Sequence, residues 1–184
     1  MKLGSMVTIL RPGFRVLNGN HPVLLVRKKR VNQDPIWRCV FDLDGNVRAE
    51  FVPRNTTVNS EYYNGLLERL RNDVRRKRPE KWTNGFILHH DNAPCQTSLL
   101  VWQFLSNKNI TVCPLPPYSP DLAPCQFWLF PKVKMTMKDK RFESIQDIKA
   151  ATTAQLKTLT KQNFRNCFRI WQERWDKCFR SEGD

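Results

Sequence analysis

Three positions of the chain combine a side chain and a placement that suit metal-dependent chemistry. Asp42 ends a segment of strand composition, Asp91 follows a second such segment, and position 126 begins a helical pattern after a proline-rich loop. If the two strands are neighbours in one sheet, both carboxylates emerge at the same edge, and the start of the helix brings a third side chain beside them. Clustered carboxylates repel one another unless a divalent cation neutralises them, and oxygen ligands suit Mg²⁺ or Mn²⁺. Such ions promote phosphodiester cleavage.

The third position carries an amide, because residue 126 is a glutamine. Gln126 offers one neutral oxygen where a carboxylate offers two oxygens and a negative charge. Since Mg²⁺ dehydrates reluctantly and favours charged ligands, we predict that Asp42 and Asp91 hold a metal ion only weakly, if at all. Asp121 is the nearest acid that could substitute for the missing carboxylate. It lies in the proline-rich loop, and we expect no rescue from it.

The elements that must position these residues follow from hydrophobic periodicity and turn signals. Ile36 to Asp42 and Val47 to Val52 have strand composition, and the Asp-Gly dipeptide between them predicts an antiparallel hairpin. A helix is predicted over Val58 to Arg78, where Tyr62, Leu66, Leu70 and Val74 form one apolar stripe that Pro79 ends. Further strands are predicted at 86–88 and 110–117, and further helices at 96–106, 127–138 and in two segments after Ser144. Strands alternating with helices predict a mixed α/β sheet with helices on its faces.

The charge of the chain indicates a polyanionic partner. The 184 residues include 31 Lys and Arg against 17 Asp and Glu, which gives a formal net charge of +14. A globular domain this basic typically contacts nucleic acid. For the basic end of the first long helix, a solvated surface favoured by the helix dipole remains an open alternative. The candidate DNA-contact residues are Arg75, Arg76, Lys77, Arg78, Tyr118, Lys132, Lys134, Lys138, Lys140 and Arg141.

Several other classes of function find little support in the sequence. The six cysteines form no C-x-x-C pair and are interpreted as reduced intracellular thiols, and the spacing of a zinc site is absent. Apolar runs are too short to span a membrane, and no glycine-rich loop indicates a small-molecule cofactor. The basic run at 27–30 is either a nuclear localisation or phosphate-contact patch or a solvated loop.

Several longer sequence motifs carry a resemblance to a known family. HDNAP and YSPDLAP, followed by KRF at 140–142, occur with FDLDGNVRAEFVP, RLRNDVRRKRPEKW and WQERWDKC. With these motifs, residues 31–184 resemble the catalytic domain of mariner transposases, of the Tc/mariner superfamily. The 34 residues from 92 to 125 separate Asp91 from position 126, which is the interval between the second and third catalytic aspartates in that family.

The resemblance implies a fold, a reaction and a site. The fold is RNase H-like, a retroviral integrase-like mixed sheet flanked by helices. The reaction is Mg²⁺- or Mn²⁺-dependent DNA cleavage followed by strand transfer, as in DNA transposition and integration. Carried over by position, Asp42 matches the first catalytic aspartate, Asp91 the second and Gln126 a degenerate third. We therefore expect impaired cleavage in a domain that binds DNA non-specifically and with salt sensitivity.

Two alternatives remain open: a residual metal-dependent endonuclease, and a non-enzymatic remnant that acts only in protein interaction. Residues 1–30 do not resemble the helix-turn-helix modules that precede the catalytic domain in complete mariner transposases, and are predicted to be a divergent N-terminal segment. The resemblance further implies a possible homodimer and a nuclear location. A related domain occurs fused to a SET-domain histone-lysine methyltransferase, but no SET segment accompanies it here and no methyltransferase activity is expected.

Overall fold

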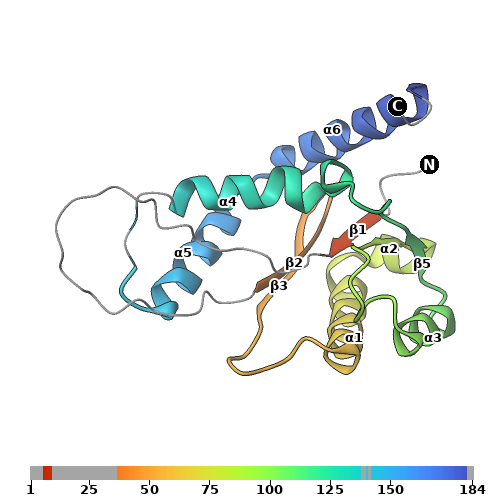
Figure 1. Ribbon diagram of the computed structural model, residues 1–184, viewed down its shortest axis with the longest axis horizontal. Coiled ribbons are helices and arrows are strands. Elements are labelled where there is room, and N and C mark those ends of the chain that lie inside the picture. The colour runs from red at the N-terminus through yellow and green to blue at the C-terminus, as the bar shows by residue number, and fades with distance from the viewer. Residues whose placement is uncertain (1–5, 10–36, 138–139, 141, 182–184) are drawn as a thin grey trace.

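One mixed sheet of five strands forms the centre of the molecule, with helices on both of its faces (Figure 1). This computed structural model describes residues 6–9, 37–137, 140 and 142–181. The strands are β1 (Met6–Ile9), β2 (Trp37–Asp42), β3 (Gly45–Phe51), β4 (Ile87–His89) and β5 (Thr111–Cys113). The helices are α1 (Ser60–Lys77), α2 (Pro79–Asn84), α3 (Leu99–Asn107), α4 (Phe130–Met137), α5 (Ile145–Thr158) and α6 (Lys161–Arg180), with a 3₁₀ turn η2 (Pro120–Leu122) and a π-helical turn η3 (Cys125–Leu129). The predicted α/β class is confirmed.

The direction of each strand decides which side chains share an edge of the sheet. The strand order is β3-β2-β1-β4-β5. β1, β4 and β5 run parallel, whereas β2 is antiparallel to both of its neighbours, β1 and β3. The carboxyl ends of β1, β4 and β5 therefore lie at one edge, and the carboxyl end of β2 lies at the opposite edge. β1 comes from the predicted N-terminal segment, so residues 6–9 of that segment belong to the same sheet.

The β2–β3 hairpin forms as predicted. β2 and β3 are joined by a tight turn in which the backbone N–H of Asp44 donates to Oδ1 of Asp42 at 2.9 Å. Gly45 has φ +127°, a conformation that L side chains rarely adopt, and this explains the Asp-Gly signal in the sequence.

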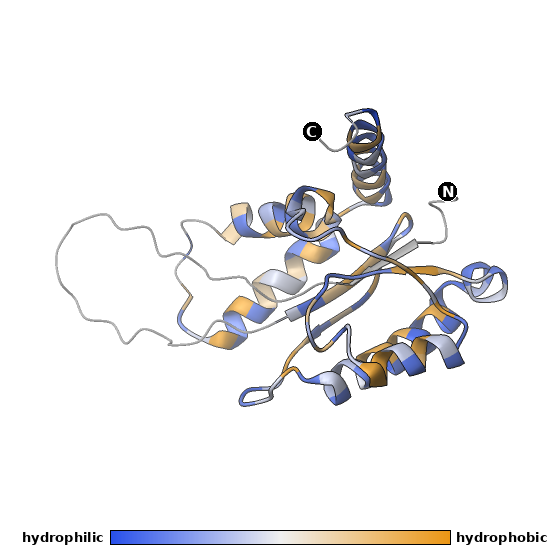
Figure 2. Ribbon diagram, turned by 45° about the vertical axis from the view of Figure 1, so that its right-hand side comes forward, coloured by the Kyte–Doolittle hydropathy of each residue, from blue (hydrophilic) through white to orange (hydrophobic). Residues whose placement is uncertain are grey.

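Two apolar layers hold the helices on the sheet. On one face, Val40 of β2 packs with the buried side of α1 and with α3. On the other, the alternate residues Trp37 and Phe41 pack with α4, α5 and α6, where Trp171 is 1% exposed. Figure 2 shows the corresponding alternation of hydrophilic and hydrophobic residues along the helices. Because all six residues of β2 are buried, every polar side chain on this strand needs a partner inside the protein.

Local signals set the ends of the helices, with small differences from prediction. Asn59 caps α1 by accepting from the backbone N–H of Tyr62, and Pro79 begins α2 at once instead of a loop. The capping box of Ser144 with Asp147 is present at the start of α5. The helix predicted from residue 127 begins as the π-helical turn η3. Among the described residues, no helix is long and apolar enough to cross a membrane.

Candidate functional site

Asp91 lies at the edge where the three parallel strands end. It follows β4 by two residues and is half-buried, and its Oδ1 accepts the backbone N–H of Ala93 at 3.3 Å. The neighbouring Asn92 amide donates to the carbonyl of Leu115 at 2.6 Å and so ties this turn to the segment after β5. A side chain in this position suits chemistry, because ligands of α/β sheets bind outside the carboxyl ends of parallel strands.

The start of η3 lies in the same region. Burial raises the pKa of the Cys125 thiol well above its usual value, and the thiols of Cys39 and Cys167 and the Asp91 carboxylate raise it further. The charge of Asp91 is thus felt at the residue next to Gln126, which is exposed. The proximity of Asp91 to Gln126 itself stays a prediction.

α6 fixes the proline-rich loop that leads into η3. Trp171 Nε1 donates to the carbonyl of Leu122 at 2.6 Å, and Arg174 donates to the carbonyl of Asp121 at 2.7 Å. Both bonds hold the backbone of the loop, whereas the Asp121 side chain is exposed. Tyr118 is fully exposed and has φ +57°, which is strained for a bulky residue.

A buried aromatic pair supports the Asp91 turn from the α1 side. The Tyr63 Oη and His90 Nδ1 atoms are 2.8 Å apart, and the two rings stack with centroids 5.9 Å apart. Burial, with a smaller contribution from His89, lowers the pKa of His90 to about 4. His90 is therefore neutral at pH 7 and acts as a packed, hydrogen-bonded support for the turn.

Asp42 lies elsewhere, and the prediction that it neighbours Asp91 is wrong. β1 separates β2 from β4, and because β2 runs antiparallel to β4 its carboxyl end lies at the opposite edge. The Asp42 carboxylate is fully buried and is held by the guanidinium of Arg78 (Nε, 2.8 Å) and the ammonium of Lys81 (Nζ, 2.6 Å). Two cations already neutralise this carboxylate, which makes it a structural anchor for the α1–α2 junction and removes it from the candidate metal ligands.

The donor set at the Asp91 edge does not fit a divalent ion. Gln126 contributes no charge. The parallel strand β1 is the neighbour of β4, and residues 1–33, which include it, contain neither Asp nor Glu. No group of three His, Cys, Asp or Glu able to hold a metal ion occurs within the described ranges. A site with one acid is poor in the charged oxygens that Mg²⁺ prefers.

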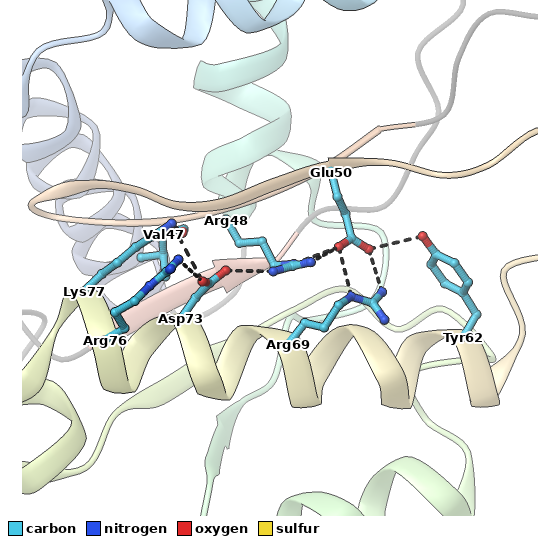
Figure 3. A network of polar contacts seen from close by, with 8 residues as sticks. All are labelled: Val47, Arg48, Glu50, Tyr62, Arg69, Asp73, Arg76 and Lys77. Atoms are coloured by element: carbon cyan, nitrogen blue, oxygen red, sulfur yellow. Dashed lines mark hydrogen bonds and ion pairs between the residues drawn. The ribbon is translucent and has the colours of Figure 1, made fainter.

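The predicted DNA-contact residues differ in their surroundings. Arg75, Lys134 and Lys140 are exposed, whereas Lys132 lies 5.8 Å from the centre of the Trp128 ring. Arg76 and Lys77 contact Asp73 within the network between β3 and α1 (Figure 3), and Arg78 holds Asp42. Lys138 and Arg141 lie outside the described residues. Arg78 is therefore engaged inside the protein and is not available as a surface phosphate contact.

The sequence analysis did not predict that two basic residues, Lys81 and Arg38, are buried. Lys81 and Arg38 are 9% and 2% exposed, although the sequence pattern alone favours solvent for both residue types. Arg38 stands in the run WRCVFD, where apolar residues flank it on both sides. A strand without regular alternation indicates burial on both faces, and this was the available signal.

Comparisons with known proteins agree with the resemblance. The sequence profile described as DDE superfamily endonuclease matches residues 26–149. The mariner Mos1 transposase of Drosophila mauritiana is 34% identical over 148 residues, which are 79% of this chain and 43% of that protein. The human histone-lysine N-methyltransferase SETMAR is 27% identical over 163 residues, 88% of this chain and 23% of that protein. The chain thus spans less than half the length of each of these curated relatives.

Solved structures match over nearly the whole chain. The catalytic domain of Mos1 mariner transposase superposes with a TM-score of 0.83 at 28% identity and covers 100% of this chain and 84% of that chain. A Mos1 paired-end complex with the left transposon end gives 0.82 at 28% identity, with 100% and 56% covered. The Mos1 catalytic domain with raltegravir and Mg gives 0.82 at 28% identity, with 99% and 85% covered. The predicted RNase H-like fold is confirmed by these matches.

Proposed function

Since the chain belongs to the DDE superfamily endonucleases, of the mariner transposase type, we propose that it acts as a DNA-binding domain in which metal-dependent strand cleavage is impaired. The single observation that carries this proposal is the donor set at the Asp91 edge. Of the three positions expected to hold metal, one is the amide of Gln126 and another, Asp42, is neutralised by Arg78 and Lys81.

A weak or absent metal site explains impaired cleavage on physical grounds. Bound Mg²⁺ or Mn²⁺ would supply Lewis-acid stabilisation of the charge that develops on phosphodiester oxygens, a contribution of several kcal/mol. Each ~1.4 kcal/mol lost slows the reaction about tenfold. Of this chain's own residues, Asp91 would hold such an ion and Gln126 would offer one further oxygen. We therefore propose that any retained binding of Mg²⁺ or Mn²⁺ is weak.

DNA is the proposed partner, through non-specific contacts to phosphates. The net charge of +14 and the exposed Arg75, Lys134 and Lys140 support this proposal. The relatives solved with a transposon end support DNA as the class of ligand. A nuclear location and a homodimer follow as parts of the same proposal.

Nicking of supercoiled plasmid in Mn²⁺ or Mg²⁺ tests impaired cleavage. We expect no cleavage by the wild-type chain and none by Gln126→Asp, because the added carboxylate together with Asp91 still lacks a third acid. Full-length Mos1 transposase is the positive control, and circular dichroism shows that each variant is folded. Wild-type nicking that Asp91→Ala abolishes would overturn the proposal in favour of the residual endonuclease.

DNA binding by the same preparations distinguishes the proposed function from the other alternative, a non-enzymatic remnant that acts only in protein interaction. A folded chain that neither cuts nor binds DNA at low salt would favour a role in protein interaction alone. A silent chain that binds DNA supports the proposal as stated.

A further inference from the structure

The apolar stripe of α6 continues past the part of the helix that the fold covers. Phe164, Phe168 and Trp171 are at most 2% exposed and lie in the core on one face of the sheet. Phe179 continues this stripe at helical spacing, yet it is 80% exposed. Figures 1 and 2 both show the C-terminal end of α6 projecting from the rest of the fold. The last turns of the helix therefore present an apolar ring that the described residues leave largely uncovered.

Two opposite charges share that side of α6. Asp176 precedes Phe179 by three residues and Arg180 by four, and residues at these spacings are neighbours on a helix surface. Both charged side chains are exposed, and neither forms an ion pair within the part of the chain that the structure describes. Lys177 stands two residues before Phe179, which places it on the opposite side of the helix. The uncovered surface therefore combines one ring, one acid and one base.

A second copy of the same surface is complementary to it. Cys178 stands midway between Asp176 and Arg180 in the sequence. If two copies of α6 cross antiparallel with a two-fold axis at residue 178, each Asp176 faces an Arg180 of the other copy, and the two Phe179 rings meet between these pairs. DNA fits this surface less well, because Asp176 repels phosphate and offsets the charge of Arg180. Copies of a chain with a net charge of +14 repel one another, so their association needs such local pairs of opposite charge.

We propose that the C-terminal turns of α6, around Phe179, form a self-association surface through which two copies of the chain pair antiparallel. The inference deepens the proposed function, of which a homodimer is part, and rests on it for the role of the dimer: two copies bound to one DNA molecule meet at a high effective concentration. Two turns of one helix offer less surface than the ~800 Å² per partner that a stable complex buries. We therefore expect a weak dimer in free solution, with a dissociation constant on the order of 100 µM.

Cross-linking at Cys178 tests this geometry in the absence of DNA. Of the six cysteines, Cys178 alone is exposed, Cys95 is half-buried and the other four are buried. A short bismaleimide, added to the folded chain near the expected dissociation constant, should link wild type and Cys95→Ser into covalent dimers but leave Cys178→Ser monomeric. Phe179→Ser keeps the thiol and should give less dimer. Dimers that form through Cys95, or equal yields in wild type and Phe179→Ser, would contradict the proposal.

Charge reversal gives a second test, in which the direction of the effect is decisive. Sedimentation equilibrium measures the self-association of Asp176→Arg, Arg180→Asp and the double variant, all changed at exposed positions. We expect each single variant to weaken association about tenfold or more, because it places like charges opposite each other, and the double variant to restore it. Lys177→Asp is the matched control, because it changes the net charge as Arg180→Asp does but on the opposite side of the helix. It should not weaken association.

Net charge alone predicts the contrary result for Arg180→Asp, since a less basic chain repels its copies less. The proposal fails if Arg180→Asp associates more strongly than wild type, if the double variant does not restore association, or if wild type stays monomeric well above the expected dissociation constant. None of these readouts uses DNA. A monomer that binds DNA would therefore remove this inference and leave DNA binding in place, and a dimer that does not bind DNA would do the reverse.

Discussion

The two ends of the sheet treat an aspartate in opposite ways. Asp42, where β2 ends, is fully buried between Arg78 and Lys81. Asp91, beyond the end of β4, is half-buried, and its charge acts on Cys125, the residue before Gln126. Asp42 is the last residue of its strand and Asp91 follows its strand by two residues, and the two strands run in opposite directions. An acid at the end of a strand therefore becomes a candidate for chemistry only when its strand ends at the edge where parallel strands also end.

Removing the charge of Asp42 is expected to cause the largest loss of stability among the variants proposed for the two ends of the sheet. Asp42→Asn leaves the side chains of Arg78 and Lys81, which are 19% and 10% exposed, without their buried counter-charge. Loss of one partner of a buried ion pair costs about 3–5 kcal/mol. We expect urea unfolding at pH 7 to show a loss of about 3 kcal/mol.

Asp44→Asn is the matched control for that measurement. Asp44 contacts Lys81 and Lys161 from a side chain that is 37% exposed, and exposed pairs contribute about 1 kcal/mol or less. If Asp42→Asn cost no more than Asp44→Asn, Asp42 would not be the structural anchor inferred here.

Lowering the pH is expected to lower the free energy of unfolding, because His90, the residue before Asp91, is buried in its neutral form. The pKa of His90 is about 4 in the folded protein, against 6.5 ordinarily, because burial disfavours the charged ring. Above pH 6.5 both folded and unfolded states are neutral. Between pH 6.5 and pH 4 the unfolded state takes up the proton first, so the free energy of unfolding falls by up to about 3 kcal/mol over that window.

The control is the His90→Asn variant, in which the free energy of unfolding is again measured as a function of pH. Its absolute stability will differ, but its unfolding free energy should decline less between pH 6.5 and pH 5, where most carboxylates remain ionised. The pKa of His89 is also lowered, mainly by burial, so some decline persists in the variant. An unchanged slope would show that His90 does not titrate in this way.

The sequence predicts the elements better than it predicts the site. The hairpin at Asp44-Gly45 is a local signal and is confirmed. Asp91 could be found from its place after a short apolar strand. The error over Asp42 arose because strand order and direction depend on distant pairings, here with β1, which no local pattern encodes. Arg38 was missed for a related reason, since burial of both faces of β2 is a property of the assembled sheet.

The smallest expected effect is on the salt dependence of DNA binding. It distinguishes exposed cations from a cation that is paired inside the protein. Lys134 and Lys140 are exposed, whereas Arg78 holds Asp42. Each phosphate contact contributes about 0.9 to the slope of log affinity against log salt. For non-specific binding to duplex DNA, measured by fluorescence anisotropy, we expect Lys134→Gln with Lys140→Gln to reduce the magnitude of that slope by about 2.

Two matched variants decide what such a change means. Lys108→Gln with Lys157→Gln removes the same charge from exposed positions on other elements and should change the slope less. Arg78→Gln should leave the slope of the folded fraction unchanged and lower stability instead, because its guanidinium is committed to Asp42. An equal loss of slope in both lysine pairs would mean that net charge alone attracts DNA. A loss of slope in Arg78→Gln would return that arginine to the DNA-contact surface and break the distinction between the two ends of the sheet.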